Sequence, residues 1–158
     1  VSTQTMESSL KASPYIKDAW VFGHNCPYPA AIIVINYPVV AKWAGQKRVA
    51  FNTFGELTQT EEVHELIGKE IERVNSRAKG PKIKKFLNLT REFDPDSELT
   101  RTGNLRRGIL ESHLGGIIEA VYAGQSEASL ETLVRYQDGH EGVRKTTLAV
   151  RAVNGVNQ

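Results

Sequence analysis

The chain contains a single cysteine, Cys26, among its 158 residues. One cysteine excludes an internal disulfide and is typical of a reducing compartment, so we expect a cytoplasmic protein. The sequence also lacks any apolar run near the roughly 20 residues that a membrane-spanning helix needs, and residues 1–16 do not have the pattern of a signal peptide. Membrane contact, if any, is expected to be peripheral, at the inner face. The absence of an initiator methionine before Val1 predicts a fragment of a longer protein.

Neither sign of charge dominates the sequence. Lysine and arginine together number 20 against 18 acidic residues, which gives a formal net charge of +2. This balance does not favour binding to nucleic acid or to a charged membrane surface. The hydrophobic share of 40% and the charged share of 24% are typical of a soluble globular domain with its own core.

Metal ligands at the expected spacing are also missing. The four histidines, His24, His64, His113 and His140, show no i,i+4 pairing and no partner carboxylates at the spacing of a zinc site. Cys26 lies in a proline-rich turn without the surroundings of a nucleophile. No metal site is therefore predicted, and the histidines are interpreted as surface or core residues.

The hydrophobic patterns predict a mixed α+β fold, with a small sheet of about three strands flanked by helices and a C-terminal β-hairpin. The run at 30–37 is apolar on both faces, which is typical of a strand covered on both sides. Thr58 followed by Glu61 predicts a capping box at the start of the clearest helix. Helices are predicted over 4–12, 39–48, 61–78 and 105–122, strands over 19–22, 30–37 and 82–89, and the hairpin over 131–137 and 143–150.

Residues 98–107 read E-L-T-R-T-G-N-L-R-R, a polar turn with one glycine that opens onto an amphipathic stretch. This decapeptide resembles the C-terminal signature of adenylate-forming ligases, the acyl-CoA synthetases and their relatives. That signature commonly reads T-R-S-G-K or L-T-R-T-x-K, followed by a basic pair. The lysine that closes the family's signature corresponds here to Asn104.

Other segments resemble the same family's small C-terminal domain, in the family's order. Residues 6–10 read M-E-S-S-L, residues 13–16 read S-P-Y-I, residues 19–23 read A-W-V-F-G and residues 82–86 read K-I-K-K-F. The series covers about residues 2–122 and is most similar to bacterial long-chain fatty acid–CoA ligases. It implies a ligase C-terminal lid domain over 1–125, an appended hairpin over 126–153 packed on the same domain, and a frayed tail over 154–158.

The resemblance also implies an activity for a larger protein. Such ligases use ATP with Mg2+ to convert a fatty acid into an acyl adenylate, and then transfer the acyl group to coenzyme A. The lid rotates against an N-terminal adenylating domain, which holds the fatty acid pocket and the phosphate-binding loop. That domain is the expected partner, in the same or a separate chain, and these 158 residues alone are expected to be inactive.

Asn104 is the candidate catalytic residue by position, and adenylation is expected to be impaired because asparagine carries no charge. A lysine suits this position because the reaction concentrates negative charge that a long, flexible cation can neutralise. The ordinary interpretation of Asn104 is a turn residue or the N-cap of the helix that follows. Arg101 and Arg106 are candidate contacts for the phosphates of the nucleotide or coenzyme A, and their ordinary interpretation is a solvated basic face.

The lysine-rich run at 79–85 is open to two interpretations. It could contact coenzyme A phosphates or an anionic lipid surface, but a solvated loop and strand edge is the favoured interpretation, because lysines protect sheet edges from pairing. Two other classes of function stay open. One is a non-catalytic interaction domain, and the other is a nucleic-acid-binding α+β module, which a pI near 8.7 favours although an aromatic-rich binding strand and a GXXG loop are missing.

Overall fold

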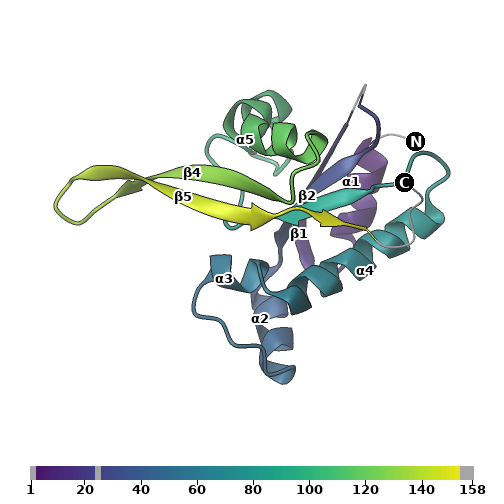
Figure 1. The fold of residues 1–158 in the computed structure, drawn as a ribbon, viewed down its shortest axis with the longest axis horizontal. Coiled ribbons are helices and arrows are strands. Elements are labelled where there is room, and N and C mark those ends of the chain that lie inside the picture. Colours follow the sequence, from purple (N-terminus) through teal and green to yellow (C-terminus); the bar gives the residue numbers. More distant parts are fainter. Residues whose placement is uncertain (1–2, 24–25, 154–158) are drawn as a thin grey trace. The chain divides into compact units, whose positions relative to one another are not determined.

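The computed structural model describes residues 3–23 and 26–153 and confirms the mixed α+β fold (Figure 1). The chain divides into two compact units, one formed by residues 1–94 with 151–158 and the other by residues 95–150. The first unit contains a sheet and four helices. Its helices are α1 (Thr3–Lys11), α2 (Tyr37–Gln46), α3 (Phe54–Thr58) and α4 (Glu61–Arg77).

The sheet of the first unit has four strands in the order β1-β2-β3-β6, namely β1 (Ile16–Phe22), β2 (Ala30–Ile35), β3 (Lys85–Asn88) and β6 (Arg151–Ala152). β1 and β2 form the predicted antiparallel pair. β2 and β3 are parallel, so the chain between them must cross from one end of the sheet to the other, and α2, α3 and α4 lie in that connection. The short β6 pairs in the antiparallel sense with the side of β3 that faces away from β2.

β2 lies at the centre of the core. All six of its residues are buried, as the apolar run had predicted, because the strand is covered on both faces. Helices α1, α2, α3 and α4 contribute apolar side chains to the same cluster as alternate residues of β2. The cluster includes Met6, Leu10, Ala31, Ile33, Ile35, Val40, Leu57, Val63, Ile67, Ile71 and Phe86.

The start of α4 differs from the predicted capping box. Thr60 is the N-cap, and its hydroxyl oxygen accepts a hydrogen bond from the amide of Val63 at 3.2 Å. The prediction that Thr58 caps this helix is wrong, because Thr58 belongs to α3 and its hydroxyl donates to the carbonyl oxygen of Gly55. The sequence interpretation missed α3, although its N-cap Thr53 accepts from the amide of Glu56, as a T-x-x-E start predicts.

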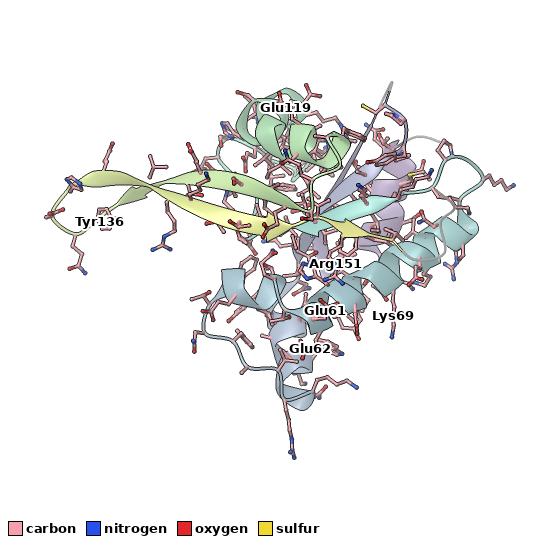
Figure 2. All side chains as sticks on the ribbon, in the orientation of Figure 1. Glu61, Glu62, Lys69, Glu119, Tyr136 and Arg151 are labelled. Atoms are coloured by element: carbon pink, nitrogen blue, oxygen red, sulfur yellow. The ribbon has the colours of Figure 1, made fainter. Side chains whose placement is uncertain are left out.

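The second unit contains α5 (Arg107–Tyr122) and the hairpin of β4 (Glu127–Arg135) and β5 (Glu141–Ala149). The hairpin is confirmed, and each strand has nine residues. Its turn contains Gly139 at a φ of 85°, a conformation that glycine adopts without strain. Figure 1 shows a long, twisted two-stranded ribbon, and Tyr136 lies at its tip in Figure 2. The predicted tail over 154–158 lies outside the described residues.

Within the part of the chain that the structure describes, no helix has the length and apolar character required to cross a membrane. The predicted division into a lid over 1–125 and an appended hairpin over 126–153 stays a prediction. The compact units fall at other boundaries, since the hairpin and α5 belong to one unit.

Truncation of Ile33 tests the position of β2 in the core. Ile33 is fully buried, so replacing it with alanine should lower the free energy of unfolding by about 2–5 kcal/mol. Urea denaturation measures this loss. The matched control is Val143→Ala on the hairpin, where the residue is 65% exposed and the expected change is within about 0.5 kcal/mol. A similar, small loss for both variants would contradict the assignment of Ile33 to the core.

Candidate functional site

The decapeptide folds into a closed turn ahead of α5. Leu99 and Leu105 form an isolated antiparallel bridge at its base. Inside the bridge, the amide of Thr100 donates to the carbonyl oxygen of Asn104 at 2.8 Å, and the amide of Gly103 donates to the carbonyl oxygen of Thr100 at 2.9 Å. Gly103 has a φ of 85°, which a residue with a side chain rarely adopts. We call residues 99–105 the signature turn.

A buried carboxylate joins the base of the signature turn to α5. Glu98 is fully buried, and its Oε2 lies 2.8 Å from Nδ1 of His113, one and a half turns into the helix. The carbonyl oxygen of Glu98 accepts from the amide of Arg106 at 2.8 Å. The main chain and side chain of Glu98 therefore hold both ends of the turn against the start of α5.

Asn104 lies on the exposed surface of the signature turn. Its amide donates to the hydroxyl oxygen of Thr100 at 3.0 Å, and its side-chain Nδ2 donates to the hydroxyl oxygen of Thr102 at 3.2 Å. The prediction that Asn104 caps the next helix is wrong, because α5 begins at Arg107 and Arg106 occupies the N-cap position. Asn104 is a turn residue, which was the other ordinary interpretation.

The two candidate arginines differ in what their guanidinium groups contact. Arg106 donates from Nε to the carbonyl oxygen of Leu99 at 3.0 Å, so it also closes the base of the signature turn. Arg101 is exposed on the same turn as Asn104 and makes no ion pair with the described residues. Of the two, Arg101 is the cation that is available to a ligand near Asn104.

The lysine run forms a loop over residues 79–84, as predicted, with Lys79 and Lys82 exposed, but it does not form the predicted edge of the sheet. Lys85 begins β3, which is an interior strand because β2 and β6 pair with its two sides. Lys82 donates from Nζ to the carbonyl oxygen of Asn75 at 2.8 Å, and Nζ of Lys84 lies 5.9 Å from the centre of the Tyr28 ring. Two of the four lysines thus contact the protein itself.

The histidines occupy separate environments. His64 is buried in α4, His113 contacts Glu98, and the His140 ring lies 5.8 Å from the Tyr136 ring at the hairpin tip, while His24 lies outside the described residues. Burial, together with the nearby positive charge of Arg151, lowers the pKa of His64 to about 4. Over residues 3–23 and 26–153, no cluster of histidine, cysteine and carboxylate side chains is arranged to hold a metal ion. Cys26 is an exposed free thiol.

The profile of the family described as AMP-binding enzyme C-terminal domain matches residues 1–126. This match covers the first unit up to residue 94, and also the signature turn and α5. The chain belongs to this family of C-terminal domains.

Curated relatives of this C-terminal domain include the long-chain-fatty-acid–CoA ligases FadD15 of Mycobacterium tuberculosis and Mycobacterium bovis. Each is 27% identical over 125 residues, which covers 77% of this chain and 21% of the relative. The chain thus spans about a fifth of the length of the curated relatives it matches.

Solved structures with local similarity include two of the O-succinylbenzoate coenzyme A synthetase MenE from Bacillus subtilis. The unliganded form has 20% identity and a TM-score of 0.37, covering 71% of this chain and 17% of that one. A double mutant bound to a product analogue has 24% identity and a TM-score of 0.34, covering 69% of this chain and 17% of the other.

The sequence interpretation of this C-terminal domain missed the pair of Glu98 and His113. The two residues are 15 positions apart, and the pair forms only because the signature turn folds back on α5. A buried carboxylate needs a partner, but the burial of Glu98 is seen only in the structure. The sequence does not specify which of the two basic residues on α5, Arg107 or His113, supplies that partner.

Removal of the His113 ring should loosen the signature turn. In His113→Ala, the amides of Gly103 and Arg106 should exchange their hydrogens about tenfold faster, because the loss of one hydrogen bond costs on the order of 1 kcal/mol. Hydrogen exchange followed by NMR measures this change. The control is His140→Ala, distant in sequence on the hairpin tip, which should leave both amides unchanged. Equal exchange in all three proteins would show that the pair does not hold the turn.

The buried His64 should make the stability depend on pH. Since its pKa falls from 6.5 in the unfolded chain to about 4 in the folded one, the unfolded chain binds the proton more readily between these values. Stability is therefore complete above pH 6.5 and decreases as the pH falls, by about 2 kcal/mol at pH 5. His64→Leu should lack this component. Urea denaturation of both proteins at pH 7 and pH 5 measures the difference, and identical pH dependence would contradict the burial of a neutral imidazole.

Proposed function

We propose that this chain is the mobile C-terminal lid of an ATP-dependent fatty acid–CoA ligase, in which Asn104 occupies the position of the adenylation lysine. The observation that carries the proposal is the family match over residues 1–126, which includes a signature turn with Asn104 exposed. The FadD15 relatives, which are named long-chain-fatty-acid–CoA ligases, support the acyl substrate class. The partner is an N-terminal adenylating domain, in the same or a separate chain.

The proposed reaction has two steps, and the lid takes part in each. A fatty acid carboxylate attacks the α-phosphate of ATP, with Mg2+ on the phosphates, to give an acyl adenylate and pyrophosphate. The thiol of coenzyme A then displaces AMP and gives the thioester. The single exposed cysteine is compatible with a reducing cytoplasm, which we propose as the location.

Asn104 changes what the lid brings to the first step. Its side-chain amide can donate hydrogen bonds, and in this structure it donates to Thr102, but it adds no positive charge. Arg101 is exposed on the same turn and makes no ion pair with the described residues, so it is the residue that we propose supplies the missing charge. Arg106 is less available because its Nε contacts the carbonyl oxygen of Leu99.

A chimera tests the lid assignment. The chain would replace the corresponding C-terminal domain of a FadD15 ligase, and acyl-CoA formation would be compared with that of the same enzyme truncated before its lid. The chimera should transfer acyl groups from a preformed acyl adenylate to coenzyme A faster than the truncated enzyme, while the 158-residue chain alone should show no turnover. Turnover by the isolated chain, or a chimera no better than the truncated enzyme, would refute the assignment.

Substitution of Asn104 by lysine should separate the two steps. In the chimera, Asn104→Lys should speed pyrophosphate release by roughly 10- to 1000-fold, because a cation in a water-poor site contributes about 1.4 to 4 kcal/mol to the transition state. Transfer from a preformed acyl adenylate should change little. Stability should change by less than about 0.5 kcal/mol, since Asn104 does not cap α5.

A matched control places the same charge elsewhere on the signature turn. Thr102→Lys adds one positive charge two residues before Asn104, and it should not speed adenylation. Arg101→Ala should slow adenylation in the parent chimera and have a smaller effect beside Asn104→Lys, because the new lysine takes over its role. Equal rates for Asn104→Lys and Thr102→Lys would indicate that general charge, and not this position, controls the step.

A further inference from the structure

A second candidate site lies within the first unit, between α4 and the edge strand β6. The structure has a pocket there with a volume of about 330 Å³. This size is at the small end of ligand pockets, which range over about 300–1,000 Å³. In Figure 2, Arg151 of β6 lies beside α4, with Glu61 and Lys69 on the helix. The pocket is formed from residues 64–72 of α4, from β3 and from β6, and it includes no part of the signature turn.

A glycine keeps the pocket open. Gly68 lies in the middle of α4, where glycine costs about 1 kcal/mol relative to alanine. Packing does not require it, because a Cβ atom at this position would lie 3.7 Å from Phe86 Cε1, at ordinary contact distance. Its φ is also not positive. A side chain at this position would instead occupy the space above the ring of Phe86, which lines the pocket.

One residue that lines the pocket, His64, has a buried polar atom without a hydrogen-bond partner among the described residues. His64 lines the pocket and is only 3% exposed, and its Nε2 has no hydrogen-bond partner among the described residues. A buried polar atom without a partner costs about 1–3 kcal/mol. A polar ligand that enters the pocket offers the imidazole a partner that the protein does not supply.

Charges of both signs surround the opening. Arg151 is held by a two-pronged contact with Glu61, at 2.6 and 2.7 Å, which leaves further guanidinium N–H groups available. Lys69 lies on α4 between Glu65 and Glu72, all three line the pocket, and none forms an ion pair within the described part of the chain. A purely anionic or purely cationic ligand would meet like charges here, whereas a ligand with both charges has partners for each.

We propose that this pocket binds a small zwitterion of the α-amino acid class. Its carboxylate lies toward Lys69 and Arg151, its ammonium group toward Glu65 and Glu72, and an apolar side chain lies over Gly68. The proposal does not depend on the ligase assignment, because every residue that it uses belongs to α4, β3 and β6.

Titration of the isotope-labelled 158-residue chain with L-leucine tests the proposal. At roughly 10 mM ligand, tenfold above a 1 mM dissociation constant, the amide signals of Gly68, Lys69 and Ala152 should shift in the NMR spectrum and those of the signature turn should not. Two analogues test each charged group separately: 3-methylbutylamine lacks the carboxylate, and 4-methylpentanoate lacks the ammonium group. Each should bind at least about tenfold more weakly, a loss of about 1.4 kcal/mol.

A variant with a matched control locates the site. Gly68→Leu fills the space above Phe86 and should abolish the leucine-dependent shifts. Gly45→Leu makes the same change in α2, where nothing lies within 4 Å of the added carbon, and it should bind like the parent chain. Circular dichroism checks that both variants are folded. The proposal is overturned if leucine causes no shifts, if either analogue binds as tightly as leucine, or if the shifts persist in Gly68→Leu.

Discussion

The burial of β2 on both faces is the constraint on which the first unit depends. An entirely buried strand must satisfy its main-chain groups through its neighbours, and β2 does so with an antiparallel β1 and a parallel β3. The parallel pairing forces a long connection, which α4 crosses. Asn75 near the end of α4 then fixes where β3 begins, since its side chain accepts from the amide of Ile83 and donates to the carbonyl oxygen of Ile83, both at 2.9 Å.

The shape of the signature turn does not depend on a charge at residue 104. Main-chain hydrogen bonds and the contact between Glu98 and His113 define its shape, and none of these depends on which side chain residue 104 carries. Asparagine is compatible with that shape, and in the proposed function it stands where a ligase of this family would carry a lysine. Arg101 then carries a positive charge on the exposed part of the turn. The proposed effect on adenylation follows from this difference in charge and requires no change in fold.

Much of the fold was predictable because its signals are local. The apolar run of β2, the periodicity of α4 and the Asp138-Gly139 turn each specify an element from neighbouring residues. The errors arose where distant segments decide the outcome. β6 lies more than 60 residues after β3 and turns an expected edge into an interior strand. The partners of Glu98 and the pocket beside Gly68 likewise depend on tertiary contacts, whereas the position of Asn104 in a turn could be predicted from its neighbours.

The central claim is that the signature turn enters the active site of an adenylating domain. The most direct measurement is thiol labelling at position 104 in a protein that joins this chain to such a domain, with Asn104→Cys introduced and Cys26 and other reactive cysteines replaced. Asn104 is exposed in the chain itself, so labelling without substrates should be fast. The account predicts at least about tenfold slower labelling when ATP and a fatty acid are bound, as expected for a site that closes over its substrates. An unchanged labelling rate under saturating substrates would contradict it.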